Sequence, residues 1–360
     1  MSSSALSVVA GSVFLGLFSK YQINNKGSRS LTPILQINYK ETLDFDRLRI
    51  HYPDKRTIDT LRSWPEHKLG YFVIDPNYNP CKNQDERDAL LGKILTMIRE
   101  NTPNVKCLIM RDGCFSGRDF HLLRMFPELE ILDLGASDNL LYLDRWDSSS
   151  KMKELPADLL NLRNLKRLGL SQCDLESFPM GLLQMEQLEA LSLFGNLIKT
   201  IPHEISALKN LKHLNLNGSC GLERFPNEIL GLSELTYLKL SYNNLKQIPD
   251  DIYLLGNLQY LQLLCTGINK LPESIGMLTK LKYLDIRSGL NKKCKNNITQ
   301  LPSSFGYLTA LEALDIDIRK VHTSHQQIAG WIRKGLPANI INKFISFAKI
   351  NKASSQLRRF

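Results

Sequence analysis

The sequence predicts an α/β fold, a solenoid in which every repeat adds a short strand to a curved parallel sheet on the concave side and a short helix to the convex side, with a cap at each end. The first observation behind this prediction is an apolar phrase, Leu-x-x-Leu-x-Leu, that returns at steps of 23, 23, 24, 23 and 23 residues. The second is a proline that follows an apolar residue at a fixed distance after each phrase. A constant period of this length indicates stacked units rather than one round core. The phrase opens at Leu165, Leu188, Leu211, Leu235, Leu258 and Leu281.

The apolar phrase has the period of a short strand. In its clearest copy Leu238 and Leu240 point to one face, whereas Tyr237, Lys239 and Ser241 point to the other. A single repeat cannot bury its leucines alone, so neighbouring repeats must stack and share one elongated core. The residues between the leucines are therefore expected to form the concave face of the sheet.

A small polar residue after each strand is expected to turn the chain out of the sheet, and a buried amide there can bond the backbone of adjacent turns. In the clearest copy it is Asn243, and its equivalents are Cys173, Asn196, Ser219 and Thr266. The prolines lack an N–H, which suits the first position of a short helix. They follow Phe178, Ile201, Phe225, Ile248, Leu271 and Leu301.

Together these phrases are the signature of the leucine-rich repeat. With the phrase aliphatic-Pro-x-x-Ile at residues 248–252 and 271–275, the chain resembles the 23-residue leucine-rich repeats of Ras-suppressor-like scaffolds, plant intracellular Ras-group proteins and their bacterial relatives. The resemblance covers residues 105–318, about nine repeats. It implies the fold, but it does not select one function, because scaffolds, receptors and ligase adaptors share this repeat.

Residues 1–29 form an apolar and polar leader. Residues 5–18 are apolar enough for a secretion signal or an anchor, but this stretch is short for a membrane span, and its basic residues follow it rather than precede it. The alternative is a strand or helix that packs on the domain.

Residues 30–104 do not follow the repeat. They predict a strand at Tyr71–Ile74 and a helix from Asp85 to Asn101, which suits an N-terminal cap or a small α/β segment. The functional alternative is a ubiquitin-ligase-type adaptor or a bacterial effector that acts through residues 1–104. Against an enzyme, the only cysteine there, Cys81, has no recognisable nucleophile setting.

Two insertions interrupt the repeats, near residues 135–154 and 290–297. The first contains Trp146, which either packs against the solenoid or makes an accessory contact with a partner. The second, with its Lys and Asn residues, is expected to be a flexible basic loop.

The net charge of +10 comes mostly from residues 319–360, which hold nine Lys or Arg and no Asp or Glu, a contribution of 9 − 0 = +9. Pro337 can start a helix whose apolar stripe includes Ile340, Ile341 and Phe344. We predict a basic C-terminal helical cap; the alternative is membrane contact through residues 337–350 on an anionic surface. Nucleic acid is not an expected partner, because the aromatic residues of the tail fit a core.

The sequence lacks the motifs of common enzymes, including Gly-rich phosphate loops, Gly-x-Ser-x-Gly and His-Glu-x-x-His, so we predict no catalytic residue, no cofactor and no metal site. The seven cysteines form no Cys-x-x-Cys pair. Cys107, Cys173 and Cys265 fall on or beside predicted strands, and we interpret them as reduced thiols of a cytoplasmic protein, with a secreted or membrane-associated recognition protein as the alternative.

The predicted binding site is the concave face. The third positions of three consecutive repeats are tyrosines, and neighbouring strands lie about 4.8 Å apart, so these rings should stack beside His213. Such a ladder either stabilises the sheet or forms the centre of a protein interface. We predict a non-enzymatic scaffold in signalling or regulation. Its predicted partner-binding residues are Phe194, His213, Tyr237, Lys239, Tyr260, Gln262, Leu264, Tyr283, Asp285 and Arg287.

Overall fold

The structure of the protein is a computed structural model, and it describes the repeats most completely. Described residues are the strands at 47–51 and 71–75, parts of 89–100, and residues 105–110, 120–134, 155–218, 221–289 and 295–357. The leader segment 5–18, Cys81 and the insertion that carries Trp146 lie outside them. The chain divides into two compact units, residues 1–150 with 156–168 and residues 151–155 with 169–360.

The first unit contains four parallel strands in chain order: β1 (Arg47–His51), β2 (Tyr71–Asp75), β3 (Cys107–Met110) and β4 (Ile131–Asp133). The predicted strand at residues 71–74 is confirmed, whereas β1 was missed by the sequence analysis. Because β2 pairs with β3 in parallel, residues 30–104 contribute strands to the sheet although they lack the repeat phrase. The unit also holds η2 (Phe120–Met125) and α4 (Ala157–Leu160), and the described residues between Ala89 and Glu100 are helical.

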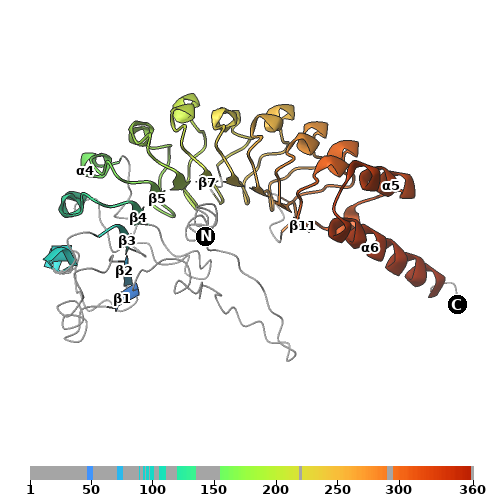
Figure 1. Ribbon diagram of the computed structural model, residues 1–360, viewed down its shortest axis with the longest axis horizontal. Coiled ribbons are helices and arrows are strands. Elements are labelled where there is room, and N and C mark those ends of the chain that lie inside the picture. The colour runs from blue at the N-terminus through green and yellow to red at the C-terminus, as the bar shows by residue number, and fades with distance from the viewer. Residues whose placement is uncertain are drawn as a thin grey trace, which may run out of the picture. The chain divides into compact units, whose positions relative to one another are not determined.

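The second unit is the regular part of the solenoid, and β5 (Arg167–Gly169) lies at its boundary. Its strands are parallel neighbours in chain order and lie along one edge in Figure 1, opposite the short helices. The nine strands from β3 to β11 match the nine predicted repeats. The strands are β6 (Ala190–Ser192), β7 (His213–Asn215), β8 (Tyr237–Lys239), β9 (Tyr260–Gln262), β10 (Tyr283–Asp285) and β11 (Ala313–Asp315).

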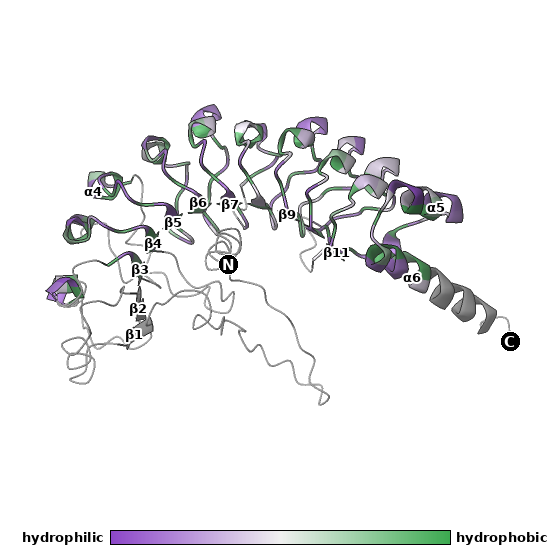
Figure 2. Ribbon diagram, in the orientation of Figure 1, coloured by the Kyte–Doolittle hydropathy of each residue, from purple (hydrophilic) through white to green (hydrophobic). Residues whose placement is uncertain are grey.

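The core of this unit consists of the repeat leucines. Leu235, Leu238 and Leu240 are fully buried, as are their counterparts in the neighbouring repeats. Hydrophobic and hydrophilic residues accordingly alternate around each turn in Figure 2. The prediction that one elongated core runs through the stacked repeats is confirmed.

Each repeat returns through a five-residue 3-10 helix that begins directly after the predicted proline. In the first of these helices the N–H of Leu182 donates to the carbonyl of Pro179, a bond that spans three residues. So short a segment favours this tighter form over an α-helix. The helices are η5 (Met180–Gln184), η6 (His203–Ala207), η7 (Asn227–Gly231), η8 (Asp250–Leu254), η9 (Glu273–Met277) and η10 (Ser303–Tyr307).

A residue in the left-handed backbone region follows the strand in five consecutive repeats. The φ angles are 55° at Gln172, 69° at Gly195, 62° at Gly218, 60° at Tyr242 and 57° at Cys265. This conformation turns the chain sharply, and glycine adopts it without steric cost. The turn is thus a property of the repeat rather than of one residue type.

In two of these repeats a buried amide at the predicted position ties the turn to its neighbours. Asn196 accepts hydrogen bonds from the N–H groups of Cys173 (3.0 Å) and Leu175 (3.1 Å), and its Nδ2 donates to the carbonyls of Leu170 and Leu193. Buried backbone groups that the turn leaves unpaired are satisfied in this way. Asn243 donates similarly to the carbonyls of Leu216 and Leu240.

The second insertion supplies the same amide in an unexpected way. Residues 290–297 were expected to form a flexible loop, but Asn296 is buried and accepts hydrogen bonds from the N–H groups of Thr266 (2.8 Å) and Ile268 (3.2 Å). Its Nδ2 donates to the carbonyl of Leu263 at 2.7 Å. The prediction was wrong for this residue because the buried amide that binds the neighbouring turn comes after the insertion rather than before it.

Three helices follow the last strand: η11 (Ile318–Lys320), α5 (His325–Lys334) and α6 (Ala338–Leu357). The ring of Trp331 lies 5.6 Å from that of Phe305 in η10 and 5.3 Å from that of Phe344 in α6. Ile340, Ile341 and Phe344 are buried, so the apolar stripe of α6 faces protein. No helix in the described part of the chain is long and apolar enough to cross a membrane.

Candidate functional site

The predicted stack of aromatic rings is present on the strand face. The strand register pairs Tyr237 with Tyr260 and Tyr260 with Tyr283. Ring centroids are 4.0 Å and 4.4 Å apart, with interplanar angles of 16° and 11°. His213 lies at the head of the stack, 5.9 Å from the ring of Tyr237 and tilted by 50°. We call these three tyrosines the tyrosine ladder.

The ladder is less exposed than a concave surface was expected to be. Tyr237 and Tyr260 keep only 5% and 9% of their accessible surface, and Tyr283 is half-buried. In part the reason is the stacking itself, since both faces of the Tyr260 ring are covered by its neighbours. Burial raises the pKa of the Tyr260 and Tyr283 hydroxyls.

Beside the ladder, side chains at the fifth and seventh repeat positions form a row of hydrogen bonds that crosses the strands. The hydroxyls of Ser171 and Ser192 are 2.9 Å apart, and the amide of Asn215 donates to Ser192 at 3.3 Å. Further along, the amide of Asn217 donates to Gln262 at 3.2 Å. We call this row the polar chain; its members are Ser171, Ser192, Asn215, Asn217, Gln262, Asp285, Arg287 and Asp315.

The polar chain ends in a charged group. The Arg287 guanidinium donates two hydrogen bonds to the Asp285 carboxylate, at 2.9 Å and 2.7 Å, and it lies 3.8 Å from Asp315. Asp285 is fully buried, whereas the Arg287 side chain is 45% exposed. The hydrogen bonds from Arg287 to Asp285 raise the pKa of Arg287. The hydroxyl of Tyr283 donates to Asp315 at 2.7 Å, which joins the tyrosine ladder to the polar chain.

The remaining predicted residues flank the ladder. Lys239 is a buried residue, and its ammonium group lies 5.5 Å from the ring centroid of Tyr237. Phe194 and Leu264 are half-buried where their strands end. Each lies against a glycine of the next repeat, since a Cβ at Gly218 would be 3.3 Å from the Phe194 ring and one at Gly289 would be 3.4 Å from Leu264.

Five members of the polar chain were not among the predicted site residues. Ser192, Asn215 and Asp315 hold the same repeat position as Gln262, and Ser171 and Asn217 hold that of Arg287. The repeat phase was therefore sufficient to find them. The hydrogen bonds between side chains were not, because rotamers decide them.

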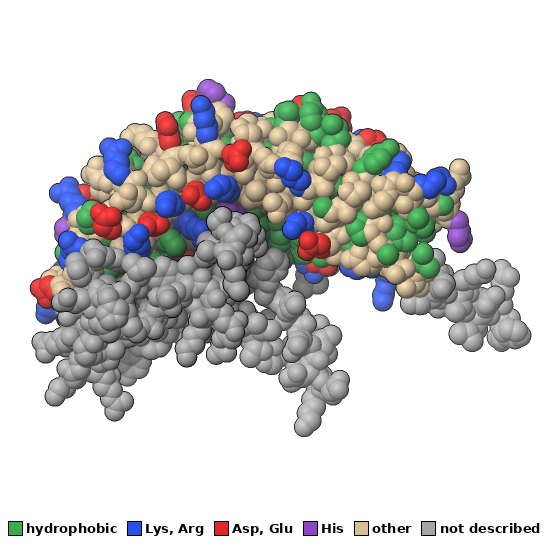
Figure 3. All heavy atoms as spheres, viewed as in Figure 1, with side chains coloured by type: hydrophobic (Ala, Val, Ile, Leu, Met, Phe, Trp, Pro, Cys, Tyr) green, Lys and Arg blue, Asp and Glu red, His purple; other side chains and the backbone are tan. Residues whose placement is uncertain are grey.

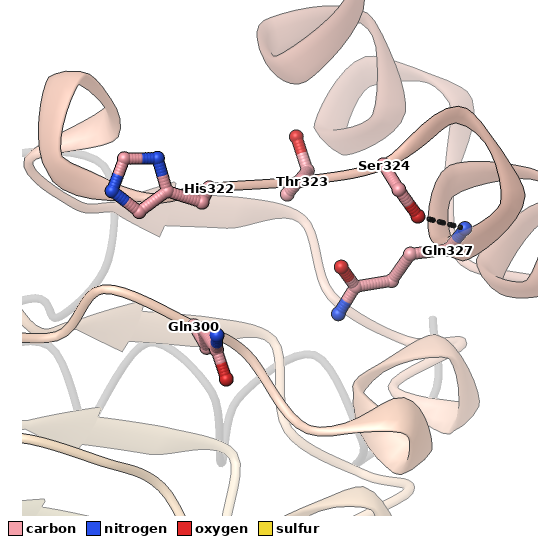
Figure 4. Close-up of a pocket in the computed structure, with 5 residues that line it drawn as sticks. All are labelled: Gln300, His322, Thr323, Ser324 and Gln327. Carbon is pink, nitrogen blue, oxygen red and sulfur yellow. Dashed lines mark hydrogen bonds between the residues drawn. The ribbon is translucent and has the colours of Figure 1, made fainter.

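The described residues also form a pocket of about 460 Å³, away from the tyrosine ladder. It is lined by Gln300, His322, Thr323, Ser324 and Gln327 (Figure 4). Its polar groups serve the fold. The backbone N–H of Gln327 donates to the hydroxyl of Ser324, which caps α5, and its side-chain amide donates to the carbonyl of Leu301. We therefore assign no ligand to this pocket.

The sequence predictions also concern metal-binding clusters and cysteines. No group of three His, Cys, Asp or Glu residues there could hold a metal ion. The described cysteines, Cys107, Cys173 and Cys265, are buried and outside disulfides. Burial raises the pKa of the Cys107 thiol, which makes it a poor nucleophile.

Comparison with known proteins agrees with this geometry. The family model described as "Leucine rich repeat" matches residues 163–222, and the one described as "Leucine-rich repeat region" matches residues 225–331. A solved leucine-rich-repeat protein of Leptospira interrogans aligns over 78% of this chain and 62% of its own, with a TM-score of 0.52 and 21% identity, which shows likeness of fold alone.

Two curated proteins share shorter stretches of sequence. The adenylate cyclase of Schizosaccharomyces pombe is 36% identical over 96 residues, 27% of this chain and 6% of that protein. The "Leucine-rich repeat and calponin homology domain-containing protein 1" of Mus musculus is 35% identical over 142 residues, 39% of this chain and 16% of that protein. The chain thus spans only a small part of the length of these relatives. From the strands, the buried amides and the matched family models, we conclude that the chain has the solenoid fold of leucine-rich repeats and that residues 163–222 and 225–331 match their family models.

Proposed function

We propose that the protein is a non-enzymatic scaffold that binds a protein partner on the strand face of its repeats, in signalling or regulation. Leucine-rich-repeat folds are generally protein-interaction scaffolds without catalytic activity. The proposed contact surface comprises the tyrosine ladder, the polar chain and the residues that flank them, Phe194, His213, Lys239 and Leu264.

The single observation that carries this proposal is the tyrosine ladder. A solenoid needs its leucines, its turn residues and its buried amides to fold, but the third position of the repeat can take other residues, such as Arg167 and Ala190. Three stacked tyrosines at this position are therefore not demanded by the architecture. Tyr is a favoured anchor of protein interfaces because it is large, rigid and amphipathic.

The polar chain supports the proposal by fixing side chains before a partner arrives. Gln262 accepts from Asn217 and donates to Asp285 (3.5 Å), while Asp285 fixes Arg287 with two bonds. Side chains that are already ordered lose less entropy on binding. The arrangement suggests a division of roles. Half-buried Phe194, His213, Leu264 and Tyr283, with exposed Arg287, contact the partner, whereas buried Tyr237, Tyr260 and Asp285 hold them in place.

Affinity measurements on strand-face variants test this proposal. The full chain serves as bait in a cross-linking pull-down, and the captured protein is purified. Phe194→Ala and Leu264→Ala remove contact side chains that only half belong to the core. Each should weaken binding about tenfold or more, equivalent to about 1.4 kcal/mol or more. The matched control is Lys270→Ala, an exposed residue away from the strand face, which should change affinity less than about twofold.

Equal affinity of Phe194→Ala, Leu264→Ala and wild-type protein for the same partner would exclude the strand face as the binding site. The tyrosine ladder would then be a device that only stabilises the sheet, by about 0.2–1 kcal/mol for each stacked pair.

We also propose that residues 30–104 and 319–360 close the two ends of the repeats. The contacts of Trp331 with Phe305 and Phe344 support this role at the C-terminal end, because they cover apolar surface of the last repeat. A cytoplasmic location is proposed from the described cysteines, which lie outside disulfides. Cell fractionation tests the location, and recovery of a processed chain from the medium would overturn it.

A further inference from the structure

Large apolar side chains are exposed in a row on the helical side of the C-terminal repeats. Leu254, Met277 and Tyr307 are the last residues of η8, η9 and η10, and Ile332 continues the row on α5. Their exposed fractions lie between 49% and 59%. We call these four residues the convex ridge. In Figure 3 hydrophobic side chains show along the outer edge of this part of the second unit.

The fold does not require apolar residues at these positions. The last residues of the preceding helices η5, η6 and η7 are Gln184, Ala207 and Gly231, which are polar or small. The change to Leu, Met and Tyr begins at η8 and continues to the end of the repeats. Exposed single apolar residues are ordinary, but a row of them marks a contact surface.

Close packing of the helices brings the members of the convex ridge together. A Cβ at Gly276 would lie 2.3 Å from the carbonyl oxygen of Ser304, and one at Gly306 would lie 2.9 Å from the Cα of Trp331. These glycines stand directly before Met277 and Tyr307. Only glycine permits so close an approach, so η9, η10 and α5 hold their exposed apolar residues side by side.

Positive charges stand at the α5 end of the convex ridge, whereas Asp250, Asp251 and Glu273 are exposed at the first turns of η8 and η9. Arg333 is exposed next to Ile332, and the ammonium group of Lys334 lies 4.7 Å from the ring centroid of Tyr307. Both belong to residues 319–360, which hold nine Lys or Arg and no Asp or Glu. The α5 end of the ridge, where apolar side chains stand beside Arg333 and Lys334, complements an apolar layer beneath a negative surface.

We propose that the convex ridge docks the protein on an anionic membrane surface. Leu254, Met277 and Ile332 enter the boundary between head groups and acyl chains, Tyr307 lies at the level of the head groups, and Arg333 and Lys334 meet the lipid phosphates. This contact differs from the sequence-based alternative at residues 337–350, since Ile340, Ile341 and Phe344 are buried in the protein. It also leaves the strand face, on the opposite side of the repeats, open to a protein partner.

Co-sedimentation with vesicles tests the proposal. The probes are vesicles of phosphatidylcholine and phosphatidylserine in equal parts and vesicles of phosphatidylcholine alone. The wild-type chain should bind the mixed vesicles more tightly, and added salt should weaken that binding. Met277→Ser and Ile332→Ser should each lower the partition coefficient about tenfold, because each removes apolar side-chain atoms from the membrane. Arg333→Gln should weaken binding to mixed vesicles only.

Met180→Ser is the matched control, because Met180 is also exposed on a 3-10 helix, η5, but lies outside the ridge. It should bind as wild type, and all four variants should keep the wild-type melting temperature. Equal binding to the two kinds of vesicle, or an equal loss in Met180→Ser and Met277→Ser, would overturn the proposal. A different result would also overturn it. If the wild-type chain is a dimer, if Met277→Ser is a monomer, and if neither protein binds vesicles, the ridge contacts a second copy of the chain instead.

Discussion

Arg287 donates two hydrogen bonds, of 2.9 Å and 2.7 Å, to the carboxylate of Asp285, which is fully buried. Removing the guanidinium would leave a buried negative charge without its main partner. Arg287→Ala is therefore expected to lower the free energy of unfolding by about 2–3 kcal/mol, less than for a fully buried pair because water reaches Arg287.

Asp285→Asn in the same chain removes the unpaired charge and should restore most of the stability lost in Arg287→Ala. Urea unfolding of wild type, both single variants and the double variant measures the coupling. Additive losses would show that the two side chains do not depend on each other.

Asn296 and Asn297 are adjacent but should respond differently to substitution. Asn296 is buried and accepts hydrogen bonds from the N–H groups of Thr266 and Ile268. Asn296→Ala leaves these buried donors without an acceptor, so it should lower the free energy of unfolding by about 3 kcal/mol or more. Asn297 is exposed, and its N–H bond to Ile268 belongs to the backbone, so Asn297→Ala should stay within about 0.5 kcal/mol. Equal decreases in the melting temperature of the two variants would refute the role of Asn296 as the buried amide that binds the neighbouring turn.

Gly276, inside η9, and Gly256, two residues after the end of η8, provide a paired test of helix packing. Gly276→Ala would place a Cβ 2.3 Å from the Ser304 carbonyl oxygen, so η9 and η10 must separate, at a cost of about 1–3 kcal/mol. At Gly256 the nearest atom to a new Cβ is 3.7 Å away, an ordinary contact. Chemical denaturation should find Gly256→Ala close to wild type, and a loss as large as that of Gly276→Ala would contradict the packing described for η9.

Leu240 and Ser241 face opposite sides of the sheet, and both are fully buried. Leu240→Ala should cost about 2–5 kcal/mol through lost transfer energy and the cavity left behind. The Ser241 hydroxyl accepts a hydrogen bond from the N–H of Leu264 at 3.0 Å. Ser241→Ala should therefore cost about 1–2 kcal/mol, because that buried N–H loses its acceptor. No change in the melting temperature of Ser241→Ala would contradict this bond.

The tyrosine ladder predicts a loss of stability at alkaline pH. Burial raises the pKa of Tyr260 and Tyr283 above the ordinary value of 10.0. Above pH 10 the unfolded chain therefore releases these hydroxyl protons while the folded chain retains them. The stabilisation is fully present below pH 10 and declines as pH rises, by at most about 1.4 kcal/mol per pH unit for Tyr260 and by less for the half-buried Tyr283.

Replacing both tyrosines by Phe should flatten the dependence of the unfolding free energy on pH above 10. Urea unfolding at a series of alkaline pH values measures this slope. The constant loss expected from the missing bond between Tyr283 and Asp315 does not interfere, because it is present at neutral pH as well. An unchanged alkaline slope in the double variant would rule out the ladder as its source.

The sequence was sufficient to predict the repeat boundaries, the buried leucines and the order of the aromatic rings, because each depends on a period that a few residues define. It was not sufficient for burial on the strand face. Ser241 and Lys239 alternate with leucines as surface residues do, yet both are buried. Contacts between neighbouring repeats decide that burial, and alternation within one strand does not report them. The strand β1 was missed because residues 30–104 lack the repeat phrase although they use the same sheet geometry.

The recurring turn and the buried amide together leave one stretch of the repeat free in length. In the repeat that begins at Leu281, the chain leaves the sheet through Gly289, whose φ is 69°, and Asn296 binds the neighbouring repeat after the insertion. The repeat that begins at Leu235 places Asn243 at the same amide position without an insertion. The β10 strand and the η10 helix can therefore keep their places whatever is spliced between them. A tag or a recognition peptide grafted after Gly289 offers a way to add a function to this protein without redesigning its core.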